Sequence, residues 1–203
     1  MVNQGNNASE TPTRPWWSPF KFDRSPEKSG WLRLFAAGTQ VVGMTAQAVV
    51  TGLWPVLLLS MPMLLGGHWY AHRVANGAKR RRWPRVLAFV AFHFVFCWLF
   101  TGLFMGLPYP QAQFAILGTA VVAIEIFSRM NLNAAIGLGM ANLYVAATLS
   151  RGYSFLFFIL AYLGLWLAYL WTADRVDGEK ASTRTIRIEE SSQPSRSRLA
   201  LPR

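Results

Sequence analysis

The sequence predicts an all-α fold, a polytopic transmembrane bundle of about six helices with both termini on the cytoplasmic side. Its 203 residues are 53% hydrophobic and 14% charged, whereas soluble domains carry about 25% charged residues. The charges are also segregated, because eight of the nine acids lie before Lys28 or after Thr172 and Glu125 stands alone between them. Long apolar runs with charges at their ends are typical of membrane helices and exclude an ordinary soluble domain.

The first apolar run, residues 34–70, is predicted to form two helices. One helix of 37 residues would extend about 55 Å, nearly twice the thickness of the hydrocarbon core. A break at residues 52–55 (Gly-Leu-Trp-Pro) divides the run, since proline is favoured in the first turn of a new helix. Four further helices are predicted at residues 86–107, 111–128, 132–150 and 153–172.

Charge placement favours six spans, with five as the alternative. Cytoplasmic loops of membrane proteins collect Lys and Arg. Six spans place the N-terminal tail (1–33), the basic loop, Arg129 and the C-terminal tail (175–203) on one side of a bacterial cytoplasmic membrane, and only Arg151 on the other. The first 30 residues contain no signal-peptide pattern. The transmembrane domain is therefore expected at 34–174, followed by a basic tail too polar to fold alone.

Two segments are predicted to meet lipid. Residues 14–22 mix Trp16, Trp17 and two phenylalanines with two cations, which suits the headgroup zone or the groove of a partner. The basic run is expected to anchor the topology and to attract anionic lipid; it comprises Lys79, Arg80, Arg81 and Arg82. No aromatic platform accompanies this run, so nucleic acid is not an expected partner.

Glu125 is the one acid predicted to lie at membrane depth. An ionised side chain there is costly and by default indicates a functional site. Because Arg129 follows at i+4, the two side chains are expected to share a helix face and form an ion pair. A proton or ion site and a contact between subunits are the alternatives.

The three histidines offer two weaker hypotheses. His68 and His72 are spaced to share a helix face, which predicts either a metal site or part of an interfacial belt of aromatic and cationic residues. His93 lies about eight residues inside its span. It is expected either to bond a polar group in the bundle or to ligate haem or a chlorin. The single cysteine, Cys97, can form no internal disulfide.

Uncharged polar and small residues within the spans predict contacts between helices. The polar residues expected to form interhelical hydrogen bonds are Gln40, Thr45, Gln47, Asn131, Asn133 and Asn142. The small residues expected to allow close approach are Gly137, Gly139 and Ala141, together with the pair Gly102 and Gly106.

The end of the fourth predicted span carries a family resemblance. The stretch Ile-Glu-Ile-Phe-Ser-Arg-Met-Asn at 124–131 keeps an acid and a base at i and i+4. With the helix pair broken near Pro55 and the basic loop, it resembles the membrane N-terminal region of bacterial transglutaminase-like (TgpA-type) proteins. The resemblance covers residues 34–175 and implies a membrane module without the family's catalytic domain, so no activity is carried over.

These observations lead to three functional hypotheses. The first is a non-catalytic integral membrane subunit or scaffold of a larger complex, which assembles with other membrane proteins. The second is a haem- or chlorin-binding subunit of an energy-converting complex that uses His93. The third is a small transporter or proton-handling protein centred on Glu125. No nucleophile–base–acid set or phosphate-binding glycine motif is present in the sequence, so an enzyme is not predicted.

Overall fold

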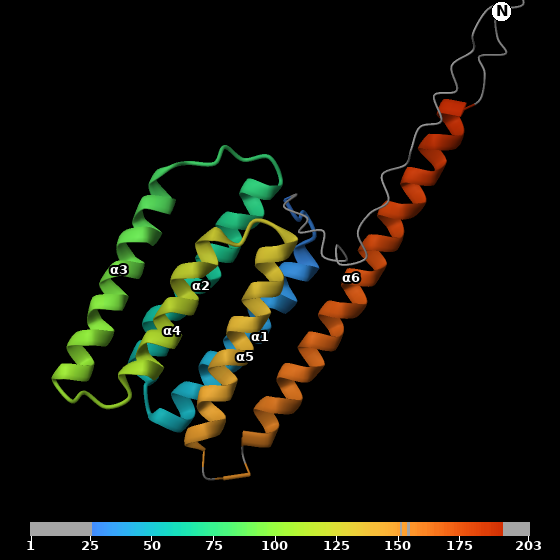
Figure 1. Cartoon of the computed structure of the whole chain (residues 1–203). Coiled ribbons are helices and arrows are strands. Elements are labelled where there is room, and N and C mark those ends of the chain that lie inside the picture. Colours follow the sequence, from blue (N-terminus) through green and yellow to red (C-terminus); the bar gives the residue numbers. More distant parts are fainter. Residues whose placement is uncertain (1–25, 151, 154, 193–203) are drawn as a thin grey trace, which may run out of the picture.

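The computed structural model describes residues 26–150, 152–153 and 155–192, which form a bundle of helices joined by short turns (Figure 1). In chain order these are α1 (Gly30–Thr51), α2 (Trp54–Ala75), α3 (Trp83–Phe104), α4 (Pro110–Val122), the 3-10 turn η1 (Ala123–Glu125), α5 (Arg129–Leu149) and α6 (Phe155–Ser192). Apart from an isolated bridge between Pro26 and Ser128, the described residues contain no β-structure. The predicted all-helical class is confirmed.

Four of the helices are long and apolar enough to cross a membrane: Gly30–Thr51, Trp83–Phe104, Arg129–Leu149 and Phe155–Glu179. Helices α2 and α4 are outside this set, and α4, with 13 residues, is only about 20 Å long. Consecutive helices nevertheless run in alternating directions along the bundle (Figure 1). The start of α1 therefore lies at the same end as loop 76–82 and loop 126–128, and we call this the basic end.

The predicted break between the first two helices is confirmed. Helix α1 stops at Gly52, whose φ of 74° is a left-handed conformation that glycine adopts without strain. Helix α2 starts two residues later, and Pro55 occupies its first turn. The chain thus reverses direction within two residues, and α1 and α2 form an antiparallel pair.

The fourth helix ends earlier than the predicted boundary at residue 128. Regular α-helix stops at Val122, η1 adds one turn, and Ile126 leaves the helical region with φ −82° and ψ 73°. Ser128 then caps α5, because its hydroxyl accepts a hydrogen bond from the backbone N–H of Asn131. The fourth helix is therefore shorter than predicted, and α5 begins at Arg129, three residues before its predicted start at 132.

Helix α6 continues beyond the predicted start of an unstructured tail at residue 175. It runs unbroken to Ser192 and projects past the bundle at the basic end (Figure 1). The segment 175–192 is polar but has no proline and a single glycine, Gly178, so nothing in it blocks helical hydrogen bonds. Its first turns are also held by an ion pair from α5, described below.

The core is organised around α1. This helix packs against α5, α6 and α2, whereas α3 lies at the edge of the bundle and contacts α4 and η1 (Figure 1). Fully buried side chains such as Leu32, Met44 and Leu64 fill the centre together with buried alanines. Most apolar side chains of α3 and α6 instead face outward, as expected of helices that meet lipid.

Candidate functional site at the basic end of the bundle

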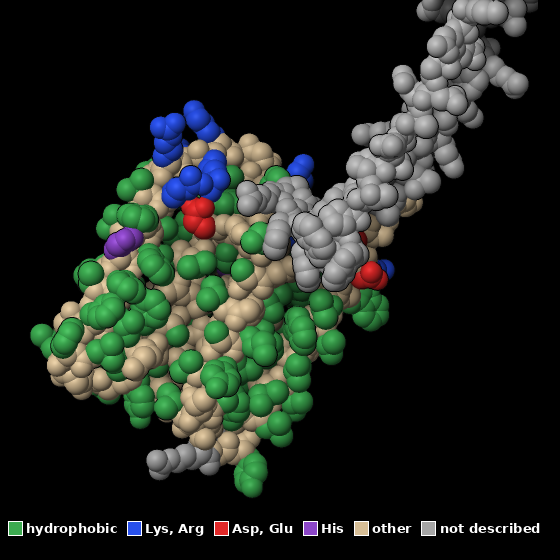
Figure 2. Space-filling view, in the orientation of Figure 1, with side chains coloured by type: hydrophobic (Ala, Val, Ile, Leu, Met, Phe, Trp, Pro, Cys, Tyr) green, Lys and Arg blue, Asp and Glu red, His purple; other side chains and the backbone are tan. Residues whose placement is uncertain are grey.

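Charged side chains gather at the basic end. On the face shown in Figure 2, the blue and red side chains lie mainly around this end, and the rest of the surface is apolar or neutral. The basic residues at this end whose side chains the structure describes are Lys28, Arg33, Arg73, Lys79, Arg80, Arg81, Arg82, Arg85, Arg129 and Arg175. At the opposite end, the described turns at 52–53 and 105–109 contain no charged residue.

The expected ion pair between Glu125 and Arg129 is wrong. Glu125 instead accepts hydrogen bonds from Arg80 at 2.8 Å and Arg85 at 3.2 Å, and these side chains are 37% to 60% exposed. The helix breaks between Glu125 and Arg129, so the i+4 geometry that would bring them together is lost. Arg80 also stacks on the Phe127 ring at 4.3 Å. Glu125 therefore fastens the α2–α3 loop to the end of η1.

Arg129 belongs to a different charged cluster. Both of its terminal nitrogens bond Asp177 of α6 at 3.1 Å, and one of them lies 3.5 Å from Glu27. Nearby, Tyr169 of α6 donates a hydrogen bond to the Asn133 amide oxygen at 2.6 Å. These contacts attach α6 to α5 and to the segment that leads into α1.

Arg33, 3% exposed, fixes the loop between η1 and α5. Its guanidinium donates to the carbonyl oxygens of Ile126 at 2.6 Å, Glu27 at 2.9 Å and Phe127 at 3.0 Å. These carbonyls belong to non-helical backbone and have no helical partner of their own, so a planar fork of donors suits them. The sequence pattern places Arg33 among the charges of the N-terminal tail and contains no signal for this role.

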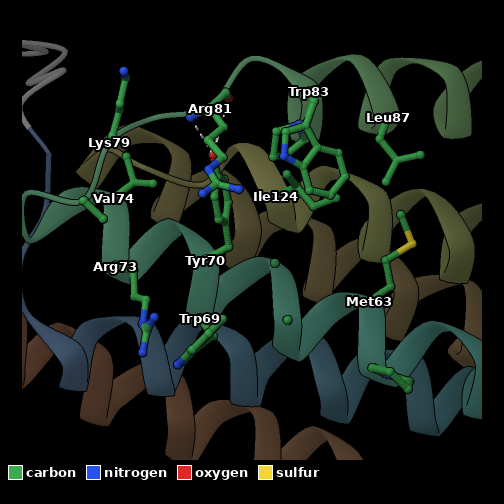
Figure 3. Close-up of a pocket in the computed structure, with 15 residues that line it drawn as sticks. Met63, Trp69, Tyr70, Arg73, Val74, Lys79, Arg81, Trp83, Leu87 and Ile124 are labelled. Atoms are coloured by element: carbon green, nitrogen blue, oxygen red, sulfur yellow. Dashed lines mark hydrogen bonds between the residues drawn. The ribbon is translucent and has the colours of Figure 1, made fainter.

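A pocket of about 610 Å³ lies between α2 and α3, beneath loop 76–82. Figure 3 shows that the side chains around it come from these two helices, the loop and η1. Its apolar wall includes Pro62, Met63, Leu87 and Ile124; its aromatic residues are Trp69, Tyr70 and Trp83; its basic residues are Arg73, Lys79 and Arg81. The pocket is thus apolar at one side and cationic at its rim.

The rim is held in place by aromatic contacts. The guanidinium of Arg73 stacks on the Trp69 ring at 4.3 Å. The Tyr70 hydroxyl accepts a hydrogen bond from the backbone N–H of Arg81 at 3.3 Å, which ties the loop to α2. Among the residues that the structure describes, no carboxylate forms an ion pair with Arg73, Lys79 or Arg81. Three positive charges therefore remain for an anionic ligand.

The predicted basic run is divided by the structure. Lys79 and Arg81 line the pocket, Arg80 pairs with Glu125, and Arg82 does neither. Successive side chains of this loop therefore have different surroundings. Trp16 and Trp17, the other predicted lipid contacts, lie outside the described residues. The aromatic residues Trp69, Tyr70 and Trp83 line the pocket. They lie in and near the segment for which the sequence predicted an interfacial belt of aromatic and cationic residues.

The histidines are not brought together. His68 is buried and bonds the Gln40 side chain at 2.7 Å, while His72 contacts the amide of Asn76. The described residues contain no group of three His, Cys, Asp or Glu side chains that could hold a metal. His93 is on the exposed side of α3 and bonds the carbonyl of Phe89 one turn away. It could therefore ligate only a cofactor bound outside the bundle.

Several predicted interhelical contacts are confirmed. Gln40 bonds His68, and Asn142 donates to the Thr119 hydroxyl at 2.8 Å. Gly139 lies directly against the backbone of α1, whereas the space around Gly137 is open. Gly102 packs against Pro110 of α4, but Gly106 lies in the following turn with φ 66°, so the two do not form one contact face.

Comparisons with models of protein families, with curated proteins and with solved structures find no match to this chain. The resemblance to the transglutaminase-like membrane region therefore stays a prediction.

Proposed function

We propose that the chain is a non-catalytic integral membrane protein that binds an anionic phospholipid in the pocket between α2 and α3. The observation that carries this proposal is the set of three basic side chains at the rim of an apolar pocket, none of which forms an ion pair with a carboxylate in the described part of the chain. A phospholipid has the same division, since its phosphate is charged and its acyl chains are apolar. Basic pockets between membrane helices near the cytoplasmic face are typical sites for such head groups.

The dimensions of the pocket support this ligand. A volume of about 610 Å³ is within the range of small-molecule sites, about 300–1,000 Å³, and can take a head group with the first part of the acyl chains. Trp69 and Trp83 lie between the basic rim and the apolar wall, where indole rings favour the boundary between head groups and hydrocarbon. The lipid would enter from the side of the bundle, with its tails against α2 and α3.

We further propose that the basic end faces the cytoplasm of a bacterial cell, with six membrane crossings and both termini inside. The alternating helix directions and the absence of charge from the described turns at the opposite end support this orientation. Helix α4 would then complete its crossing with η1 and loop 126–128. The cytoplasmic leaflet is also the one richer in accessible anionic lipid charge.

The proposed lipid site is tested by measuring which lipids stay bound to the protein. Replacing Arg73, Lys79 and Arg81 together with alanine is expected to weaken binding of phosphatidylglycerol about a hundredfold, because each cation near the surface contributes about 1 kcal/mol. Native mass spectrometry of the protein released from mixed phosphatidylglycerol and phosphatidylcholine nanodiscs measures the retained lipid. Wild-type protein should retain phosphatidylglycerol selectively.

Two matched variants separate the pocket from the general positive charge. Arg82→Ala removes the same charge as Arg81→Ala from the next residue but does not touch the pocket, so it should leave retention nearly unchanged. Gly66→Phe changes no charge and projects a ring into the pocket, since no atom lies within 4 Å of a Cβ there. Retention that is equal in Gly66→Phe and wild type would contradict a lipid inside the pocket.

A second candidate function, a subunit of a larger membrane complex, is favoured by the extension of α6. The part of this helix after Glu179 continues to Ser192 past the bundle and is about 20 Å long. A helix that projects on the same side as the pocket is accessible to a partner at the membrane surface.

Truncation tests this second function. A chain that ends at Glu179 retains the Arg129–Asp177 contact, so it should keep the thermal stability of the full chain. It should lose any subunit that co-purifies with the full chain in mild detergent at a defined stoichiometry, as measured by mass spectrometry. A full-length chain that purifies alone as a monomer would contradict the function.

A further inference from the structure

A stripe of polar residues runs along the buried side of α1, away from the lipid pocket. Arg33, Gln40 and Gln47 recur at intervals of seven residues, which places them on one face of the helix. Arg33 is 3% exposed and the two glutamines are completely buried. From Arg33 to Gln47 the stripe extends about 21 Å, given a rise of about 1.5 Å per residue.

Two neighbouring helices present polar side chains to this stripe. His68 of α2 bonds Gln40 through its Nε2 atom at 2.7 Å. Asn142 of α5 is 1% exposed and lies beside α1, since its Cβ is 3.2 Å from the position of a Cβ built on Gly43. Its amide nitrogen donates to the Thr119 hydroxyl and to the carbonyl of Leu138, whereas its amide oxygen has no hydrogen-bond partner in the protein.

Each of these side chains keeps a buried polar atom without a protein partner. The atoms are Arg33 Nε, Gln40 Nε2, His68 Nδ1, Gln47 Oε1 and Nε2, and Asn142 Oδ1. Among the residues that the structure describes, the buried side-chain nitrogens and oxygens that have no partner all belong to this set. Other buried polar groups are satisfied within the protein, as Thr39 is by Ala36 and Ser60 is by Leu57.

An amide without a partner in an apolar interior is strongly unfavourable, and buried polar groups are nearly always hydrogen-bonded to protein or to water. The unpartnered atoms here include both donors and acceptors. A ligand that donates and accepts is therefore required. The basic Arg33 at one end and the lack of a carboxylate in the set disfavour a cation.

We infer that the α1 stripe binds a file of internal water molecules inside the bundle, from Arg33 at the basic end to Gln47 near the opposite end of α1. Water satisfies both carbonyl oxygens and amide nitrogens, and each internal water in proteins makes about three such bonds. This site is separate from the lipid pocket, because His68 faces α1 while the neighbouring Trp69 and Tyr70 line the pocket.

Met44 provides an internal probe. It is fully buried and lies between Gln40 and Gln47 on the same side of α1, at i+4 and i−3. Millisecond radiolysis of the full chain in nanodiscs generates hydroxyl radicals from water in place and oxidises adjacent methionines. If water occupies the stripe, Met44 should be oxidised at a rate close to that of the exposed Met130 in the first turn of α5, despite its complete burial.

A Met44 oxidation rate at least about tenfold below that of Met130 in the wild-type protein would overturn the inference, because a site without water generates no radicals. A Gln47→Leu variant provides a second test, because it removes two of the polar atoms proposed to bind water. It should lower Met44 oxidation about fivefold, with oxidation of the exposed Met105 unchanged. Equal Met44 oxidation in this variant and wild type would also count against the site. The wild-type measurement decides the matter even if the variant does not fold.

Discussion

Replacing Arg33 with alanine is expected to lower the free energy of unfolding by about 3–5 kcal/mol, the cost typical of breaking a buried charged network. The guanidinium donates to the carbonyls of Ile126, Glu27 and Phe127. Without it these carbonyl oxygens stay buried with fewer hydrogen-bond partners. The segment that precedes α1 then loses its attachment to the loop between η1 and α5. Arg33→Lys should recover little, because a single ammonium cannot reproduce the planar fork.

Unfolding in mixed micelles with increasing denaturing detergent, followed by circular dichroism, measures this loss. Arg85→Ala is the matched control, since it removes the same charge from the basic end but from an exposed pair with Glu125. Its expected loss is below about 1 kcal/mol. Equal losses for the two variants would show that net charge, rather than the buried hydrogen bonds of Arg33, determines stability at this end.

The sequence predicts the helices well because membrane spans are defined by long apolar runs. The reversal at Gly52 and Pro55 follows from backbone chemistry that is local, namely a left-handed glycine and a proline in the first turn. The pattern of charges likewise predicts that the basic residues, except Arg151, lie at one end, since they fall in the two tails or in loops on the same side of the six predicted spans. These features need no knowledge of which helices are neighbours.

Partners of individual side chains are less predictable, because they depend on contacts between distant segments. Glu125 and Arg129 are compatible with one helix face, but Ile126 leaves the helix and the two residues join separate clusters. The bonds of Arg33 to residues more than 90 positions away have no local signal. The lipid pocket also forms only where α2, α3 and η1 meet. The sequence predicted its basic residues and its aromatic residues as separate features, not as one site.

Close approach of α1 and α5 depends on Gly139. A Cβ at this position would lie 2.8 Å from the Thr39 carbonyl oxygen, and the obstacle is the backbone of α1, which cannot rotate away. Gly43 faces the Gly139 carbonyl from the other side, so the two helices meet backbone to backbone. This crossing brings Asn142 against α1 and belongs to the largest interface of the bundle.

Gly139→Leu is therefore expected to force α1 and α5 apart and to lower the free energy of unfolding by about 3 kcal/mol, the upper part of the range for overpacked cores. Gly137→Leu is the matched control, since it makes the same substitution two residues earlier on the same helix, at an exposed position with no atom within 4 Å. It should be neutral or slightly stabilising, because leucine is a better helix former than glycine. The detergent unfolding used for Arg33 measures both variants. If they lose equal stability, α1 and α5 do not depend on a glycine at their crossing.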